Sequence, residues 1–245
     1  MDEKYAIRTA NLRKVYKVGS EKVVALDNIN LSIPHGEICC LLGTSGSGKS
    51  TLLNLLAGLE KPSRGTIHIN GRSIESMSEA KLAKFRQKSF GFVFQSYNLL
   101  PSLTAIENVS MPLLFKGVRR KRRTKLANDM LNSVGLNDRK KHKPTQMSGG
   151  QQQRVGIARA FVANPLIVFA DEPTGNLDTK TTVEVIESMV NMTRERNRTL
   201  IIVTHDPEIS EYADRIIHIR DGNIIEDKYN DTASKGEQQN EKPLV

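Results

Sequence analysis

Tryptophan is absent from this sequence of 245 residues, only two cysteines occur, and no apolar run is long. Cys39 and Cys40 are adjacent in an apolar stretch. This placement suits neither a disulfide framework nor a zinc site, so we expect two small strand residues in a reducing compartment. The longest apolar stretches, 52–59 and 166–170, are far shorter than the roughly 18 to 20 residues of a bilayer span. Residues 1–5 do not begin a secretory signal. These absences exclude a membrane-spanning chain and a disulfide-rich secreted domain.

The composition is that of a globular protein. Hydrophobic residues make up 38% of the chain and charged residues 26%, a balance that allows a core to form and excludes global disorder. The length suits one large α/β domain, or one domain with an inserted lobe. Residues 228–245 contain almost no apolar side chains, so we expect a polar, solvated tail there.

The N-terminal third predicts strands. Apolar residues alternate with polar ones in 29–33 and 67–69, and the pair Asn70-Gly71 is typical of a tight hairpin turn. Residues 37–42 are nearly all apolar, which favours a strand buried on both faces of a sheet. We therefore expect a β-rich N-terminal part and at least one central strand.

Helical and strand patterns alternate in the rest of the chain. Leucines recur at helical spacing through 52–59, helical patterns dominate about 79–163, and an amphipathic helix around 183–190 separates two apolar strands. Those strands are 166–170 and 200–203, and a last hairpin is expected at Asp221-Gly222. Buried strands that alternate with helices predict an α/β fold with a parallel sheet covered on both faces.

A phosphate-binding loop connects the strand 37–42 to the helix that follows. Gly43, Gly48, Lys49 and Ser50 match the spacing of this loop, and the strand-to-helix context is the one it requires. Its glycines let backbone N–H groups point at phosphate oxygens, Lys49 can reach the β and γ phosphates, and the Ser50 hydroxyl can bind Mg²⁺. The alternative is a glycine-rich turn without a ligand.

Two further features fit a nucleotide site. Asp171 and Glu172 follow the apolar strand 166–170, where one carboxylate can serve the magnesium and the next the attacking water. Ser148 precedes two glycines and a helical pattern, which predicts a second anion-binding helix N-terminus. The alternatives are a solvated strand end and an ordinary helix cap.

Together these residues resemble the ATP-binding subunit of an ATP-binding-cassette transporter. The segment 147–154, Met-Ser-Gly-Gly-Gln-Gln-Gln-Arg, is similar to the family signature, although Met147 stands where leucine is usual. Thr44 likewise replaces a frequent proline. The resemblance extends over about 5–227 in family order. Gln95 resembles the glutamine loop, Asn176-Leu177-Asp178 the D-loop, His205 the switch histidine and Tyr16 the aromatic residue that stacks on adenine.

The resemblance implies an ABC ATPase domain over 1–227, with a phosphate-loop core, an N-terminal antiparallel β subdomain and a helical subdomain inserted at about 96–163. It also implies a second copy of the chain, because in this family each ATP lies between the phosphate loop of one subunit and the signature helix of the other. Nucleotide contacts are expected from Tyr16, Gly43, Thr44, Ser45, Gly46, Ser47, Gly48, Lys49, Ser50, Thr51, Ser148, Gly149, Gly150, Gln151 and Asp178. The resemblance implies catalytic roles for Glu172, His205 and Gln95. It implies contacts with magnesium for Ser50, Gln95 and Asp171.

The implied function is an ATPase that uses ATP and Mg²⁺ to drive a membrane permease from the cytoplasmic face of the membrane. A groove near 95–108 is the expected permease site. The segments 92–101 and 170–178 resemble the lipoprotein-releasing, macrolide-efflux and antimicrobial-peptide-resistance branch, which favours an exporter. The alternatives are a non-transport ATPase of the same superfamily, in DNA repair or translation, and a regulator that does not hydrolyse ATP. Coiled-coil insertions, zinc modules and a tandem cassette are not visible, and intact Glu172 and His205 disfavour the regulator.

The net charge of +9 is concentrated in one segment. Residues 116–143 contain eleven basic and two acidic residues, so this excess of nine equals the net charge of the whole chain. The segment is interpreted as a solvated charge run, as a surface for anionic headgroups, or as a nucleic-acid surface. The last is disfavoured because Phe115 is the only aromatic residue nearby, and no nucleic-acid partner is expected.

Overall fold

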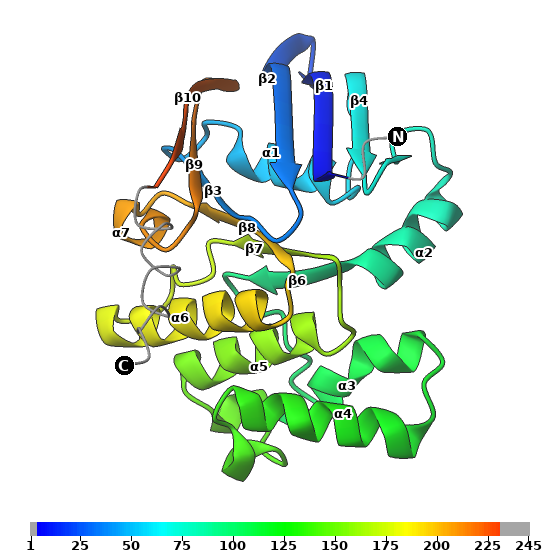
Figure 1. Cartoon of the computed structure of the whole chain (residues 1–245), viewed down its shortest axis with the longest axis vertical. Coiled ribbons are helices and arrows are strands. Elements are labelled where there is room, and N and C mark those ends of the chain that lie inside the picture. Colours follow the sequence, from blue (N-terminus) through cyan, green and yellow to red (C-terminus); the bar gives the residue numbers. More distant parts are fainter. Residues whose placement is uncertain (1–3, 231–245) are drawn as a thin grey trace, which may run out of the picture.

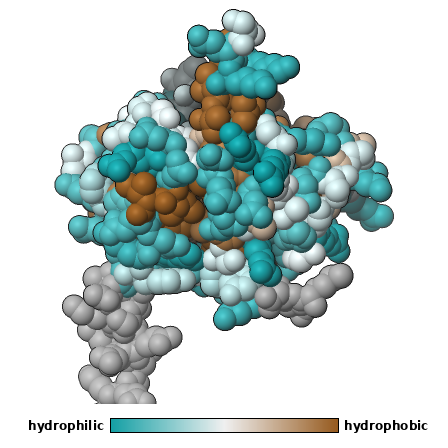
Figure 2. Space-filling view, turned by 90° about the horizontal axis from the view of Figure 1, so that it is seen from above, coloured by the Kyte–Doolittle hydropathy of each residue, from teal (hydrophilic) through white to brown (hydrophobic). Residues whose placement is uncertain are grey.

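Two sheets organise the computed structural model, which describes residues 4–230 (Figure 1). The first sheet is antiparallel, with strand order β2-β1-β4-β5. Its strands are β1 (Tyr5–Val18), β2 (Glu21–Pro34), β4 (Arg64–Ile69) and β5 (Arg72–Ser73). Asn70 and Gly71, which connect β4 to β5, have φ values of 48° and 72°, so the predicted hairpin is confirmed. Figure 2 shows the molecule from above this end, where apolar patches interrupt a mostly hydrophilic surface.

The second sheet has six strands in the order β10-β9-β3-β8-β7-β6. The strands are β3 (Ile38–Leu42), β6 (Phe90–Phe94), β7 (Ile167–Asp171), β8 (Thr199–Thr204), β9 (Arg215–Arg220) and β10 (Asn223–Tyr229). All pairs are parallel except β9–β10, which the turn at Asp221-Gly222 joins as predicted. The fold is therefore the predicted mixed α/β arrangement of a parallel sheet, an antiparallel sheet and helices.

Helices cover the second sheet, and several of them lie on the side away from the first (Figure 1). They are α1 (Lys49–Leu56), α2 (Glu79–Ser89), α3 (Ala105–Phe115), α4 (Arg120–Ser133), α5 (Gly149–Phe161), α6 (Thr179–Glu195) and α7 (Pro207–Ser210), with two short 3-10 turns, η1 (Asn137–Arg139) and η2 (Pro144–Gln146). In Figure 1, α3 and α4 form the end of the molecule opposite the antiparallel sheet. Within residues 4–230, no helix combines the length and apolar character needed to cross a bilayer.

The core has two parts that meet at the parallel sheet. Ile38, Cys40 and Leu42 of β3 belong to the apolar cluster shared with α3–α6, whereas Cys39 and Leu41 belong to the cluster shared with α1 and the antiparallel sheet. All five are buried. Since successive side chains of a strand point to opposite faces, β3 is covered on both sides, as its apolar run predicts.

Three details differ from the sequence expectations. Helix α1 ends at Leu56, because Gly58 adopts a left-handed φ of 61°, and Leu59 is 48% exposed instead of packed in the helix. Val183 of α6 is likewise exposed. Lys228 and Tyr229, expected to begin the tail, are the last residues of β10 and pair with β9. The remainder of the predicted tail, 231–245, lies outside the described residues.

Candidate nucleotide site

The glycine-rich loop leaves β3 at the edge of the parallel sheet and leads directly into α1. Gly46 and Gly48 have φ values of 79° and 106°, a region that favours glycine. A Cβ atom on Gly43 would lie 2.2 Å from the carbonyl oxygen of Ile219. The loop can therefore pack against β9 only with glycine at this position.

Lys49 is held inside the loop. Its Nζ atom donates hydrogen bonds to the carbonyl oxygens of Gly43 and Thr44, both at 2.7 Å, and the residue is 6% exposed. Burial lowers the pKa of Lys49, and the nearby carboxylates of Glu172 and Asp171 oppose that shift. The loop thus presents one buried ammonium group to the cavity beside it.

That cavity has a volume of about 800 Å³. It brings together residues from the phosphate loop and from the ends of three parallel strands, which lie side by side because parallel strands end at one edge of the sheet. The lining residues predicted from the sequence are Gly43, Thr44, Ser45, Gly46, Gly48, Lys49, Ser50, Thr51, Gln95, Glu172 and His205. Ala25, Leu42 and Pro207 also line it. No sequence signal identified these three, because they contribute shape rather than chemistry.

Two side chains with oxygen atoms suited to bind magnesium lie close together next to the phosphate loop. The Ser50 hydroxyl lies 3.4 Å from Oδ1 of Asp171, at the end of β7. Burial raises the pKa of Asp171, and the charge of Glu172 raises it further, so a cation here would offset an electrostatic cost. A hydroxyl and a carboxylate that leave room for phosphate oxygens fit the oxygen coordination of Mg²⁺.

Glu172 has an unusual backbone conformation and a direct histidine contact. Its φ is 45°, and its N–H donates to the carbonyl oxygen of Val203 at 2.9 Å. Nδ1 of His205 lies 3.0 Å from both carboxylate oxygens of Glu172. The His205 side chain is 66% exposed and that of Glu172 19%. A sheltered carboxylate thus faces the cavity beside an accessible imidazole.

Gln95 connects this cavity to the loop after β7. Its carbonyl oxygen accepts a hydrogen bond of 3.1 Å from Nδ2 of Asn176. A Cβ atom on Gly175 would lie 2.5 Å from Nε2 of Gln95, so a side chain at Gly175 would displace the amide. The glutamine and D-loop segments, distant in sequence, are therefore in contact.

The signature residues lie elsewhere in the same chain. Ser148 caps α5, with Oγ accepting from the N–H of Gln151 at 3.3 Å and Oε1 of Gln151 accepting from the N–H of Ser148 at 3.1 Å. A Cβ atom on Gly150 would lie 2.4 Å from Cγ2 of Thr181, and one on Gly149 would lie 2.8 Å from the Tyr97 hydroxyl. Ser148, Gly150 and Gln151 line a separate cavity of about 430 Å³. One chain thus has two distinct cavities, one at the phosphate loop and one at the start of α5.

Asp178, Tyr16 and Ser47, all predicted to contact the nucleotide, do not line the large cavity. Asp178 caps α6 and accepts from the N–H and hydroxyl of Thr181 at 3.0 and 2.7 Å, which lowers the pKa of Asp178. The Tyr16 hydroxyl donates to Oε2 of Glu60 at 2.7 Å. Ser47 is 3% exposed, and its hydroxyl has no hydrogen-bond partner within residues 4–230. The nucleotide contacts of these residues stay predictions.

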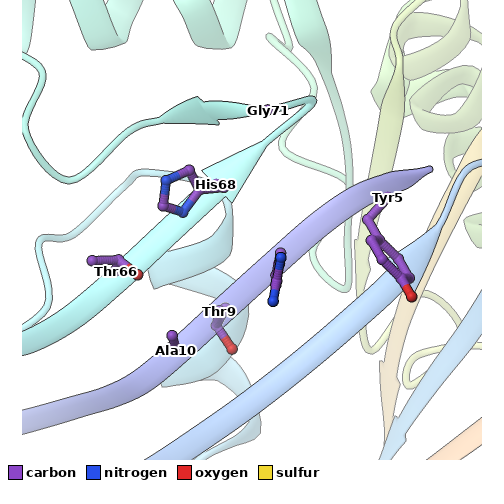
Figure 3. A pocket seen from close by; sticks show the side chains of 7 residues that line it. Tyr5, Thr9, Ala10, Thr66, His68 and Gly71 are labelled. Atoms are coloured by element: carbon purple, nitrogen blue, oxygen red, sulfur yellow. The ribbon is translucent and has the colours of Figure 1, made fainter. Parts of the chain in front are cut away.

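A further hollow of about 530 Å³ is lined by Glu172 and His205 together with residues of α6 and α7. Two others lie elsewhere on the surface. An apolar groove of about 620 Å³ lies between α2, β6 and the C-terminal ends of α3 and α5, lined in part by Phe90, Phe92, Phe94, Met111, Pro112 and Phe115. It is beside, and not on, the segment 95–108 where a groove was predicted. A smaller cavity of about 300 Å³ lies on the antiparallel sheet, where Tyr5 and His68 project from neighbouring strands (Figure 3). The predicted site residues line neither of these two.

Comparisons with known proteins agree with this geometry. A family model described as ABC transporter matches residues 26–175. An uncharacterised ABC transporter ATP-binding protein of Methanocaldococcus jannaschii is 49% identical, covering 90% of this chain and 98% of its own. The lipoprotein-releasing system ATP-binding protein LolD of Geobacter metallireducens is 45% identical, with the same two coverages. A dimeric ATP-binding cassette in a post-hydrolysis state, bound to ADP and Pi, superposes with a TM-score of 0.83 at 41% identity, covering 91% of this chain and 98% of that one.

Proposed function

Since this chain belongs to the ABC transporter family as an ATP-binding protein, we propose that two copies close head to tail around two ATP molecules and drive a membrane permease. The observation that carries this proposal is the separation of the two cavities, which we interpret as half-sites. The phosphate loop and Glu172 surround one cavity, whereas the Ser148 helix N-terminus belongs to another. A second copy would bring the two kinds of half-site together.

The residues of the phosphate-loop half-site supply the hydrolytic chemistry. Lys49 and the loop N–H groups bind the β and γ phosphates, and Ser50 and Asp171 hold Mg²⁺, which neutralises phosphate charge when bound. Glu172 accepts a proton as water attacks the γ-phosphorus and the bond to the bridging oxygen breaks, releasing ADP and phosphate. His205 orients Glu172 and the γ-phosphate, and Gln95 contacts the metal and the water.

The signature half-site binds the γ-phosphate held by the partner copy. The first N–H groups of a helix have no acceptor within it, so the start of α5, at Gly149 and Gly150, is free to bind an anion. Asp178 and Gln151 lie next to this helix start. Hydrolysis removes the phosphate that bridges the copies, and the dimer opens.

The apolar groove receives a cytoplasmic segment of the permease. Phe115 is 67% exposed at its rim, and an exposed aromatic beside an apolar groove is typical of a protein interface. This contact keeps the chain peripheral, at the cytoplasmic face of the membrane. The similarity to a lipoprotein-releasing system ATP-binding protein supports an exporter that acts on lipoproteins. Peptides and antibiotics are the other substrate classes that the resemblance of 92–101 and 170–178 implies.

Replacing Glu172 by Gln tests the hydrolytic role. The amide keeps the size of the side chain but cannot accept the proton, so we expect ATP turnover by the purified chain to fall by about a hundredfold or more. ATP should still bind, so the variant should form a stable ATP-dependent dimer in size-exclusion chromatography.

Glu187→Gln is the matched control, because Glu187 is an exposed carboxylate on α6. It should hydrolyse ATP at the rate of the unaltered chain. Undiminished turnover by Glu172→Gln would overturn the role given to this carboxylate, and an ATP-bound variant that stays monomeric would overturn the head-to-tail dimer.

A further inference from the structure

The most strongly charged surface of the molecule has no role in the proposed ATPase cycle. It consists of exposed basic side chains around α4 and η1, which we call the basic surface: Arg119, Arg120, Lys121, Arg122, Lys125, Arg139, Lys141 and Lys143. Only Glu107, Asp129 and Asp138 contribute negative charge within 104–143. Among residues 4–230, no ion pair joins a cation of the basic surface to a carboxylate.

The basic surface comes from two segments of the chain, 119–125 and 139–143. The fold brings both segments to one end of the molecule. The N–H groups of Ala105 and Ile106 donate to the carbonyl oxygens of His142 and Lys140 at 2.8 and 3.0 Å, so the second segment lies over the start of α3. Helix α4 packs along α3 from the other side. Hydrogen bonds from Thr104 lower the pKa of Glu107 in α3, and the charges of Lys143 and Arg120, one from each segment, lower it further. The cations therefore act as one surface.

The positive charges in the first turn of α4 interact unfavourably with the dipole of this helix. All four residues 120–123 are basic, no acidic residue lies in this turn, and the cap residue Arg119 provides no side-chain hydrogen bond. Positive charge near a helix N-terminus is unfavourable, so this arrangement destabilises the isolated helix. An external layer of negative charge would reverse that effect.

The basic surface begins four residues after Phe115, which lines the apolar groove. Leu114 and Phe115 are 49% and 67% exposed at the end of α3 and precede the first basic segment. Apolar side chains next to clustered cations are typical of surfaces that bind anionic bilayers. Stacking aromatics within the cations, which single-stranded nucleic acid would require, are missing from 116–143.

We propose that the basic surface binds the anionic headgroups of the membrane directly, so that the chain attaches to lipid as well as to its permease. This proposal depends on the proposed function in one respect only, namely that the apolar groove faces the membrane. Lipid binding holds the groove towards the bilayer and raises the local concentration of the chain around its permease. Phosphate oxygens of the headgroups accept hydrogen bonds from the guanidinium and ammonium groups.

Co-sedimentation of the full chain with vesicles tests this proposal. The vesicles contain either phosphatidylcholine alone or equal parts phosphatidylcholine and phosphatidylglycerol. We expect binding only to the anionic vesicles and its loss at about 1 M salt, where the screening length falls to about 3 Å. The four-site variant Arg119→Gln, Arg120→Gln, Lys121→Gln, Arg122→Gln should lower the partition coefficient by about a hundredfold or more, because each cation near an anionic surface contributes about fivefold.

A second four-site variant controls for net charge: Lys17→Gln, Lys22→Gln, Arg72→Gln, Lys81→Gln. All four residues are exposed and belong to β1, β2, β5 and α2, outside the basic surface. It should bind anionic vesicles nearly as well as the unaltered chain. Both variants should keep the circular dichroism spectrum and ATP turnover of the unaltered chain. ATP turnover separates failure of this proposal from failure of the proposed function.

Equal losses of binding in the two variants would overturn the proposal, since net charge alone would then explain the effect. Absence of binding to anionic vesicles would overturn it as well. So would tight binding of duplex DNA that the first variant alone abolishes and that outcompetes the vesicles, because the surface would then recognise nucleic acid.

Discussion

Glu37 is a carboxylate buried at the start of β3, where the chain enters the parallel sheet. It is 8% exposed, its Oε1 atom has no hydrogen-bond partner within residues 4–230, and Nη1 of Arg215 lies 3.6 Å away. Burial raises the pKa of Glu37 from its ordinary value of 4.5 to about 7, although Arg215 lowers it. Asp214 and Asp227 contribute to the increase. The arginine is already engaged by Asp227, to which its Nε and Nη2 atoms donate at 2.6 Å.

This shift predicts a specific pH dependence of stability. The folded chain binds the Glu37 proton more tightly than the unfolded chain, so the stabilisation from protonation is lost as the pH rises from about 4.5 to about 7. Glu37→Gln removes this titration. We expect the unfolding free energy of the unaltered chain, relative to the variant, to fall by on the order of 2 kcal/mol between pH 5 and 8.

Urea unfolding at several pH values measures this difference, with the exposed Glu21→Gln as control. The control should show the pH dependence of the unaltered chain. A difference between the unaltered chain and Glu37→Gln that does not change with pH would contradict the prediction.

Helix α3 is the element that joins the groove to the rest of the helical region. Its start is fixed by a capping box in which the N–H of Thr104 donates to Oε2 of Glu107 at 2.8 Å, and by buried Asn108, whose Oδ1 accepts from the N–H of Leu100 at 2.8 Å. Its C-terminal end carries Phe115 at the rim of the groove. The helix thus combines a fixed start with an exposed apolar end.

Phe115→Glu tests the groove as the permease site. A carboxylate would place charge in an apolar contact, so we expect co-purification with the proposed permease partner to fall by about tenfold or more. ATP turnover by the isolated chain should stay unchanged, because Phe115 is remote from the nucleotide cavity. Val18→Glu, at a position 64% exposed in the β1–β2 hairpin, is the control. Full retention of the permease by Phe115→Glu would contradict the assignment.

At the scale of the whole molecule, the two half-sites predict an assembly that a cross-link can detect. One copy carries Ser45→Cys and the other Ser148→Cys, both in the Glu172→Gln background. Native Cys39 and Cys40 are fully buried, and burial raises the pKa of both thiols, so a maleimide cross-linker should react with the introduced cysteines. We expect a cross-linked dimer only in the mixture of the two copies with ATP and Mg²⁺.

The control pairs Ser45→Cys with Lys81→Cys. Lys81 is exposed on α2 and does not line the cavity formed by Ser148, Gly150 and Gln151, which we call the signature cavity. This pair should not cross-link. A Ser45–Ser148 cross-link that forms equally well without nucleotide would rule out closure around ATP, and so would the absence of this cross-link when ATP and Mg²⁺ are present.

Local patterns predicted the parts of the site that lie next to each other in sequence. The loop at 43–50 and the carboxylates at the end of β7 follow apolar strands, and parallel strands that end together bring them to one cavity. The contact between Tyr16 and Glu60, the position of the groove and the pairing of His205 with Glu172 depend on the packing of distant segments. Spacing within one sequence contains no information about such packing.

Helix α5 extends from the cavity that Ser148 lines to the apolar groove. It begins at Ser148, in the signature cavity, and Arg159 and Ala160 near its last turn line the apolar groove. On the way, buried Gln153 donates to the carbonyl oxygen of Pro173, and Nη2 of Arg159 donates to that of Tyr97 at 2.7 Å. At about 1.5 Å per residue, its 13 residues form a rod of about 20 Å. If phosphate binds at the Ser148 end as proposed, a tilt of this rod would also displace Arg159 and Ala160 in the groove proposed to bind the permease.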